Sequence, residues 1–230
     1  MTAVILQARL DSSRLPQKSL LDLNGEPLVF RVMSALKKLS CDIHVLACPE
    51  DSLDAFAPLA EKASFHIIAG SKEDVLQRYC KAIRHFKIDT IIRATGDNPF
   101  VFTDSAEKIK SEALELKADY ASYAGLPHGA GVEFVTAKAL LEAERAASLQ
   151  SEREHVCPYL YNNPDKFLLH RPLAPEIWQE PSLRITVDTK DDYEKAKVLY
   201  TSLTELESTE KRDRHLGENI ICACKRKENL

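Results

Sequence analysis

Residues 3–18 read AVILQARLDSSRLPQK, a short apolar run that leads directly into a long polar loop. The run Ala3–Gln7 predicts a buried strand, because it is too short for a signal peptide and has neither a basic flank nor a cleavage site. The loop has neither the glycine spacing of a dinucleotide-binding fold nor the lysine pattern of a P-loop ATPase. It does bring three cations, two serines and many backbone amides to the end of one strand.

The alternation of apolar strand and amphipathic helix continues through the first half of the chain. Strands are predicted at 43–47, 65–69 and 90–94, and helices at 27–39, 52–63, 73–86 and 104–116. Apolar strands that are separated by helices indicate a parallel sheet covered on both faces. The sequence therefore predicts an α/β fold whose residues 1–118 form a nucleotide-binding half.

After about residue 118 this rhythm changes. Short strands are predicted at 120–123, 132–135 and 184–187, helices at 138–147 and 191–206, and a frayed basic tail at 225–227. No linker or repeat divides the chain, and one domain is the default for its length. We therefore expect a single domain, residues 1–230, with a C-terminal tail at 208–230.

The composition is that of an ordinary folded protein. The chain has 230 residues, of which 44% are hydrophobic and 29% charged, and a net charge of −4. This mild acidity argues against a general nucleic-acid binder, and no run approaches the roughly 20 apolar residues of a membrane helix. The six cysteines include no C-x-x-C pair, which favours free thiols in a reducing compartment. We expect a cytoplasmic protein with no nucleic-acid or membrane partner.

The cations of the first loop could bind phosphate. Arg9, Arg14 and Lys18 could neutralise a triphosphate, because Arg forks onto phosphate oxygens and Lys acts as a point charge. The alternative is a solvated loop whose cations stay hydrated, and charge alone does not separate the two interpretations.

Two acids follow predicted strands. Asp97 stands in Arg93-Ala-Thr-Gly-Asp-Asn-Pro99, and Asp188 follows Val187. Ligands of open α/β sheets bind at the carboxyl ends of strands, so both acids could hold one Mg²⁺ against phosphates. The alternatives are structural: Gly-Asp-Asn-Pro is also a good turn, and Asp188 could cap the following helix.

Other segments carry weaker signals. Residues 70–78, GSKEDVLQR, suit an ordinary helix start with a serine cap and an acidic first turn. The seven histidines form no H-x-x-x-H or H-E-x-x-H pair, and no G-x-S-x-G is present. A zincin and a serine hydrolase of the nucleophile-elbow type are therefore not supported.

Taken together, five blocks in order resemble the cytidylyltransferases that activate acidic sugars, in the branch named for spore coat polysaccharide biosynthesis protein F. The blocks are residues 5–18 with Gly25 and 27–28; 70–79; 93–99; 153–159; and 184–189. The resemblance implies a single-domain, three-layer α/β/α fold like the nucleotide-diphospho-sugar transferases, with a mostly parallel sheet and a small dimerisation arm. It makes residues 119–207 the sugar-binding and dimerisation half, and implies a homodimer.

The resemblance also implies roles for individual residues. Catalytic roles fall to Arg14, Lys18, Asp97 and Asp188, of which Asp97 and Asp188 match the family's metal acids and imply Mg²⁺ as the cofactor. Nucleotide contacts fall to Gln7, Ala8, Arg9, Ser12, Ser13, Ser71, Asp74, Arg78, Thr95 and Gly96. Glu133 and His155 lie in the blocks nearest the sugar.

The chain departs from the family pattern at three places. Asp11 and Gln17 stand where the family usually has Gly, which makes the phosphate loop stiffer and less positive. Gly131 stands where the branch usually has Asp, so an acidic group is lost beside the implied sugar pocket. These departures allow a different sugar or reduced activity.

The leading hypothesis is a Mg²⁺-dependent nucleotidyltransferase of the EC 2.7.7 class. It would join CTP to an acidic or modified sugar, giving a CMP-sugar and pyrophosphate for surface polysaccharide synthesis. Alternatives are another nucleoside triphosphate with a sugar phosphate, and a non-catalytic relative that binds a nucleotide or a partner. A glycosyltransferase of the same fold is less favoured, because Thr95-Gly-Asp97 replaces the expected Asp-x-Asp.

Overall fold

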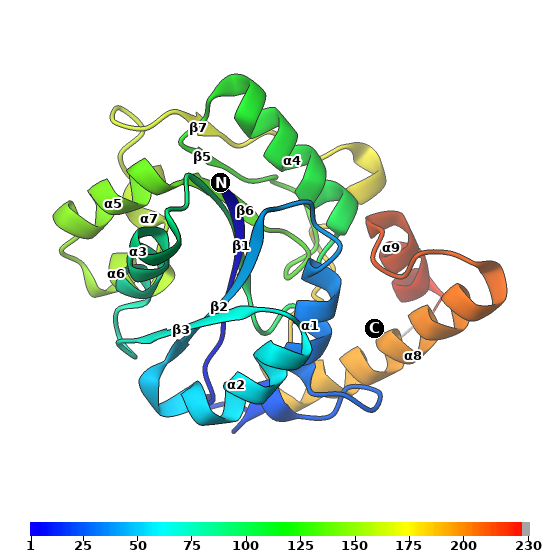
Figure 1. Ribbon diagram of the computed structural model, residues 1–230. Coiled ribbons are helices and arrows are strands. Elements are labelled where there is room, and N and C mark those ends of the chain that lie inside the picture. Colours follow the sequence, from blue (N-terminus) through cyan, green and yellow to red (C-terminus); the bar gives the residue numbers. More distant parts are fainter. Residues whose placement is uncertain (227–230) are drawn as a thin grey trace.

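The computed structural model describes residues 1–226 and confirms the α/β fold, with one sheet between two layers of helices (Figure 1). The strands are β1 (Thr2–Gln7), β2 (Ile43–Pro49), β3 (His66–Gly70), β4 (Thr90–Thr95), β5 (Tyr120–Ala121), β6 (Glu133–Thr136) and β7 (Leu169–His170). They form one sheet in the order β3-β2-β1-β4-β6-β5-β7. Only β6 runs antiparallel to its neighbours, so the sheet is mostly parallel, as predicted.

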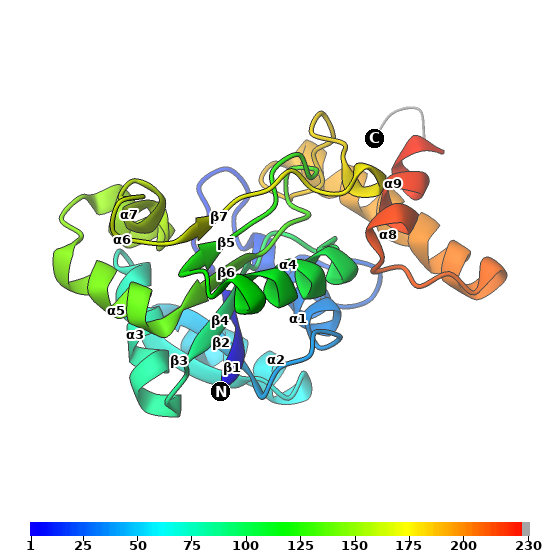
Figure 2. The same cartoon turned by 90° about the horizontal axis from the view of Figure 1, so that it is seen from above.

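Helices cover both faces of this sheet. They are α1 (Leu28–Leu36), α2 (Leu53–Lys62), α3 (Val75–Phe86), α4 (Thr103–Leu116), α5 (Ala137–Ala146), α6 (Gln150–His155), α7 (Pro158–Tyr161), α8 (Lys190–Glu210) and α9 (Gly217–Lys225), with short 3-10 turns η1 (Lys18–Leu20), η2 (Glu50–Ser52) and η3 (Glu176–Trp178). One face is covered by α3, α5, α6 and α7 and the other by α1, α2, α4, α8 and α9, and Figure 2 shows the two groups at opposite sides.

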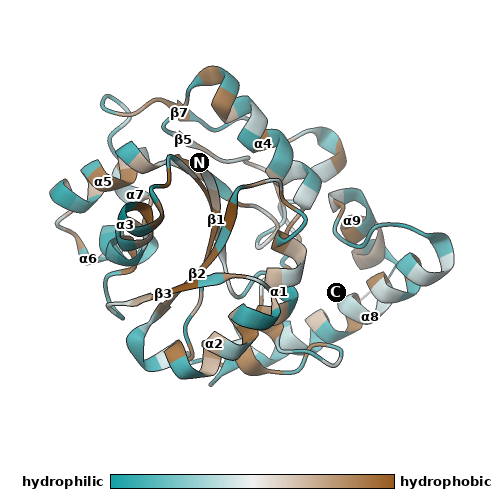
Figure 3. Ribbon diagram, viewed as in Figure 1, coloured by the Kyte–Doolittle hydropathy of each residue, from teal (hydrophilic) through white to brown (hydrophobic). Residues whose placement is uncertain are grey.

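The apolar strands sit between the layers, as burial of both faces requires. Residues 3–6 of β1 have no exposed surface, and Figure 3 shows apolar residues along β1, β2 and β3 with polar ones on the outer helix surfaces. No helix within residues 1–226 has the length and apolar character needed to span a bilayer. All six cysteines are free thiols, as predicted.

The register of the sheet brings two loops to the same place. β1 lies between β2 and β4, and Gln7 at its end pairs with Thr95 at the end of β4. The loops that follow these two parallel strands therefore leave the sheet side by side. This is the edge at which open α/β sheets bind ligands.

The predicted strand at 184–187 is wrong. The segment is extended, but within residues 1–226 it joins no strand of the sheet and forms one isolated bridge, between Arg184 and His128. Its backbone bonds are divided between two loops, because Ile185 N–H donates to the carbonyl of His128 and Val187 N–H to that of Asp97. The segment therefore connects the loop that contains His128 to the loop that follows β4.

The predicted tail at 208–230 is also wrong for the described residues. α8 continues to Glu210, and α9 packs Ile220 and Cys224 into the core. Gly217, the first residue of α9, packs against the rings of Phe102 and Trp178, which leave no room for a Cβ atom. At 225–227, the predicted fraying is wrong for Lys225, the last residue of α9, while Lys227 lies outside the described residues.

Candidate active site

A cavity of about 470 Å³ opens at the carboxyl ends of β1 and β4. Thirteen of the predicted site residues line it: Gln7, Ala8, Arg9, Ser12, Ser13, Arg14, Lys18, Arg78, Thr95, Gly96, Asp97, His155 and Asp188. We call the part around Arg14, Lys18, Asp97 and Asp188 the Lys18 end. The part around Gln7, Val75, Arg78 and Arg93, beside α3 and α6, is the Gln7 end.

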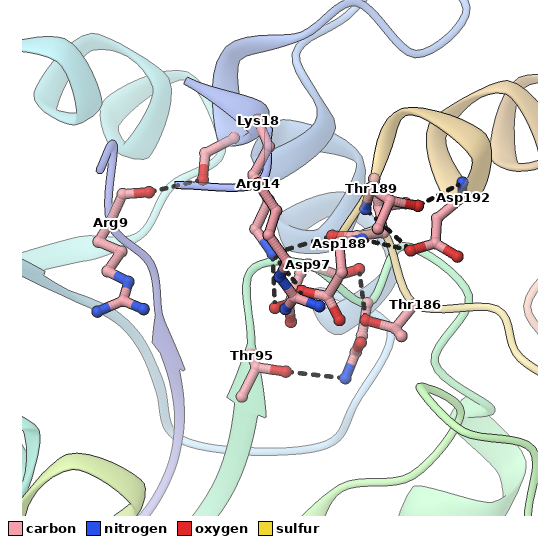
Figure 4. Close-up of polar contacts among 12 residues, drawn as sticks. Arg9, Arg14, Lys18, Thr95, Asp97, Thr186, Asp188, Thr189 and Asp192 are labelled. Carbon is pink, nitrogen blue, oxygen red and sulfur yellow. Dashed lines mark hydrogen bonds and ion pairs between the residues drawn. The ribbon is translucent and has the colours of Figure 1, made fainter. Parts of the chain in front are cut away.

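At the Lys18 end, one ammonium group joins the two predicted acids. Lys18 Nζ donates to Asp97 Oδ2 at 3.0 Å, to Asp188 Oδ1 at 2.9 Å and to the carbonyl of Val187 at 2.9 Å. Figure 4 shows Lys18 directed at both acids and Arg14 beside Asp188, while Arg9 points elsewhere. An ammonium has three donors, so all the donors of Lys18 Nζ are used in these three hydrogen bonds. The positive charge lies between the two carboxylates.

Asp188 is surrounded by cations. Besides Lys18, its carboxylate contacts Arg14 Nη2 at 3.0 Å and Arg184 Nη2 at 2.6 Å. Burial works to raise the pKa of Asp188, but the contacts with Lys18, Arg184 and Arg14 outweigh it and hold the pKa below its ordinary value. The carboxylate is therefore ionised at neutral pH.

Asp188 is also free of a capping role. Thr189 is the N-cap of α8, and its hydroxyl accepts from Asp192 N–H at 3.2 Å while Asp192 Oδ2 accepts from Thr189 N–H at 2.9 Å. This reciprocal capping box satisfies the helix start without the Asp188 side chain. The structural alternative for this acid is therefore wrong, and its carboxylate faces the cavity.

Gly96 fixes the position of Asp97. Its N–H donates to the carbonyl of Gln7 at 2.8 Å, and a Cβ atom at residue 96 would lie 2.8 Å from the Cβ of Ala8. The loops after β1 and β4 can thus touch only because residue 96 has no side chain. The turn expected here is also present, since Asn98 Nδ2 donates to Thr95 Oγ1 at 2.8 Å. The turn chemistry and the placement of Asp97 in the cavity are both realised.

At the Gln7 end, Arg78 is buried without an acidic partner. Only 2% of it is exposed, its Nη1 donates to the carbonyl of Ser71 at 2.9 Å, and its Nε has no partner within residues 1–226. Burial lowers the pKa of this guanidinium. A buried donor without a partner is costly, so Arg78 favours a ligand with acceptor atoms.

Ser71 and Asp74 do not line this cavity. Asp74 caps α3 by accepting from Gln77 N–H at 2.9 Å, and its other oxygen pairs with Arg153 Nε at 2.9 Å. Both residues form the turn that begins α3, and a direct nucleotide contact by either stays a prediction. The cap expected from the sequence was a serine, and the structure uses Asp74 in its place.

Glu133 lies behind the cavity and not on its wall. Its carboxylate pairs with Arg93 and accepts from the Tyr120 hydroxyl at 2.5 Å. Burial works to lower the pKa of Arg93, but Glu133 outweighs it and keeps the pKa above its ordinary value, so Arg93 stays charged. A sugar contact by Glu133 stays a prediction, whereas its contact with Arg93 is part of the structure.

Sequence reasoning missed several lining residues: Ser19, Val75, Arg93, Asn98, His128, Glu154 and Thr186. A charged residue inside an apolar strand was a signal for Arg93, and adjacency to a predicted acid or histidine was a signal for Asn98 and Glu154. His128 and Thr186 gave no such signal, because only the bridge between their segments places them here. Gly131, where the branch usually has an acid, is not part of the lining.

The two acids fit a hard divalent cation. Within residues 1–226 no group of three His, Cys, Asp or Glu side chains forms a complete metal site. Asp97 and Asp188 nevertheless offer carboxylate oxygens to one shared cation, now the Lys18 ammonium. Mg²⁺ is commonly held by one or two carboxylates together with water and substrate phosphates, so this donor set suits it.

Comparison with known proteins assigns the family. The cytidylyltransferase family model matches residues 3–220. The chain belongs to the cytidylyltransferase family. It is 36% identical over 203 residues to the spore coat polysaccharide biosynthesis protein SpsF of Bacillus subtilis (strain 168), covering 85% of each chain.

Solved structures of other cytidylyltransferases share the fold. A cytidylyltransferase from Leptospira borgpetersenii superposes with a TM-score of 0.85 at 24% identity, over 98% of this chain and 94% of that one. A CMP:2-keto-3-deoxy-manno-octonic acid synthetase complexed with CTP gives 0.68 at 16% identity, over 87% and 98%. The fold inferred from the resemblance is therefore confirmed.

Proposed function

We propose that this cytidylyltransferase transfers CMP from CTP to a hydroxyl of an acidic or modified sugar, with Mg²⁺ as its cofactor. The observation that carries the proposal is the Lys18 end, where two cations and two acids meet at the carboxyl ends of β1 and β4. The match to a protein of spore coat polysaccharide biosynthesis supports a role in surface polysaccharide synthesis. Following the family, we propose that it works as a homodimer.

The reaction joins the sugar hydroxyl oxygen to the α-phosphorus and breaks the bond from that phosphorus to the bridging oxygen of pyrophosphate. The hydroxyl proton leaves to solvent, and the products are a CMP-sugar and pyrophosphate. Such transfers ask the protein mainly for positioning and for stabilisation of charge on the transferred and leaving groups. A site rich in cations suits this task.

Arg14 and Lys18 are the residues that would bind the triphosphate. The Arg14 side chain is 63% exposed and can turn from Asp188 to phosphate oxygens. Asp97 and Asp188 would hold Mg²⁺, which when bound neutralises phosphate charge and orients the leaving group. Because Lys18 now bridges these acids, we expect nucleotide binding to draw its ammonium toward the phosphates.

The test is release of pyrophosphate. The protein is incubated with CTP, Mg²⁺ and a panel of acidic sugars, and each acceptor is matched with its sugar phosphate and with UTP, ATP and dTTP. We expect release only with CTP, Mg²⁺ and an unphosphorylated sugar. Release with a sugar phosphate and another triphosphate would contradict the proposed substrates. Nucleotide binding without turnover on any acceptor would favour a non-catalytic relative.

A further inference from the structure

The Gln7 side chain is held by two donors on the same oxygen. Its Oε1 accepts from Arg93 Nε at 3.1 Å and lies 3.2 Å from the Tyr79 hydroxyl, which also lies 3.3 Å from the Ile5 carbonyl. Arg93 has donors only, so a flipped Gln7 amide would set donor against donor. The oxygen is thereby occupied, and the amide nitrogen is the side-chain atom of Gln7 that stays free to contact a ligand.

A chain of contacts fixes the donor that holds Gln7. Arg93 pairs with Glu133, and Glu133 accepts from the Tyr120 hydroxyl at 2.5 Å. The side chains of Arg93 and Glu133 are 13% and 20% exposed, and Tyr79 is fully buried. Charged hydrogen bonds in such a setting are stronger than those in water and resist rearrangement. Gln7 therefore has one amide orientation and not two.

The Gln7 side chain can offer a ligand only the hydrogen-bond donors of its amide nitrogen. Within residues 1–226 the Gln7 amide nitrogen has no hydrogen-bond partner, and Gln7 lines the cavity. The apolar lining residues Ala8 and Val75 belong to the same part of the wall. We expect a triphosphate held at the Lys18 end to place its base elsewhere in the same cavity, where Gln7 and the apolar Val75 are lining residues.

We propose that Gln7 is a specificity-determining residue that donates to the acceptor edge of cytosine, with Arg93, Tyr79 and Glu133 as the residues that position it. The inference rests on the proposed function, since it needs CTP in this cavity. Cytosine presents N3 and O2 as neighbouring acceptors, whereas the N3–H of uracil is a donor that would face the Gln7 amide nitrogen. A glutamine whose amide could flip would bind both bases, whereas one whose amide orientation is fixed selects cytosine.

Calorimetric titration of CTP and UTP, each with Mg²⁺, tests the proposal through the ratio of their dissociation constants. Gln7→Glu keeps an acceptor for Arg93 and Tyr79 but removes the donor, so the preference for CTP should fall by about tenfold or more. Repulsion of the new carboxylate from the triphosphate affects both nucleotides alike and cancels in the ratio. Gln7→Met should weaken CTP binding without improving UTP binding.

The positioning residues need their own readout. Tyr79→Phe keeps the buried ring but removes one of the two donors on Gln7 Oε1, so the CTP preference should fall by a smaller factor. Tyr200→Phe is the matched control, because Tyr200 is also buried but packs against Phe100 on the other face of the sheet. A loss of packing alone would not change the ratio of the two nucleotides.

A second measurement does not depend on any variant's effect on affinity. The side-chain NH₂ signal of Gln7 in a ¹⁵N-correlated NMR spectrum, assigned by its absence in Gln7→Met, should shift when CTP and Mg²⁺ are added. An unshifted signal in the CTP complex, or an unchanged CTP preference in Gln7→Glu, overturns the inference while leaving the proposed function standing. A wild-type protein that binds neither nucleotide overturns both.

Discussion

The two ends of the cavity are built from different interactions. At the Lys18 end, charged side chains on loops neutralise one another, and Arg14 is largely exposed. At the Gln7 end, side chains from β1, β4, β6 and α3 form a mostly buried chain of hydrogen bonds. Ions on loops can exchange partners when phosphates and a metal arrive, whereas a buried network holds one arrangement. Phosphate transfer needs the first property, and selection among bases needs the second.

The largest effect is expected at the Lys18 end from Asp97→Ala. Removing one of the two acids that would hold Mg²⁺ should lower turnover by at least about a hundredfold, because charge on the transferred phosphate loses its main stabilisation. Pyrophosphate release measures this, and thermal unfolding should show an intact fold. Glu26→Gln is the control, since it removes an acid that pairs with Lys62 at the surface, and it should leave turnover unchanged. Full activity in Asp97→Ala would contradict the proposal that Asp97 holds Mg²⁺.

The contact between the two loops is tested by Gly96→Ala. The added Cβ atom would lie 2.8 Å from the Cβ of Ala8, so the β1 and β4 loops must move apart. Such overpacking costs about 1–3 kcal/mol in the free energy of unfolding, and displacement of Asp97 should lower kcat by about tenfold. Gly131→Ala is the matched control, because its Cβ would meet only the end of the Leu126 side chain. Equal kcat for both variants would show that the loop contact does not position Asp97.

All four residues that define the Lys18 end were predicted, whereas the contacts that hold Gln7 at the other end were not. Arg14 and Lys18 follow β1 and Asp97 follows β4, and the resemblance of the five sequence blocks to the cytidylyltransferases grouped these residues with Asp188. The pairing of Arg93 with Glu133 depends on the register of the antiparallel strand β6, which lies 40 residues further along the chain. No local pattern encodes that register, and so the contact of Glu133 with Arg93 could not be predicted, while its contact with a sugar stays a prediction.

Local competition explains the remaining differences. The sequence predicts a serine cap at the start of α3, and the structure has Asp74 as the cap, while a nucleotide contact by Asp74 stays a prediction. The apolar residues of 184–187 match a strand, but the backbone of this segment bonds to the loops at His128 and Asp97. Both cases turn on partners that come from distant segments.

An effect of intermediate size is expected from Asp188, in the pH dependence of the free energy of unfolding. The pKa of Asp188 lies below its ordinary value of 3.8, because Lys18, Arg184 and Arg14 outweigh the effect of burial. This carboxylate therefore stabilises the fold above that ordinary value, and the contribution is lost as pH falls through the lowered pKa. The wild-type protein should exceed Asp188→Asn in free energy of unfolding at pH 7, with the difference shrinking below about pH 4. Denaturant unfolding at several pH values measures it, and a difference that grows on acidification would contradict the account.

The smallest effect is expected from Glu154→Gln. Arg9 Nη1 lies 3.7 Å from Glu154 Oε1, and the two side chains are 52% and 40% exposed. Exposed pairs of this length contribute little, so the free energy of unfolding should change by less than about 0.5 kcal/mol. Chemical denaturation measures this value. A loss of several kcal/mol would show that the ion pair of Arg9 and Glu154 stabilises the fold far more than an exposed pair should.

The most direct test of the account is calorimetric binding of CTP with and without Mg²⁺, to the wild-type protein and to Asp97→Ala. We expect Mg²⁺ to tighten CTP binding to the wild-type protein and to have little effect on the variant. Equal binding with and without Mg²⁺, or no binding of CTP at all, would contradict the joint assignment of the triphosphate and the metal to the Lys18 end.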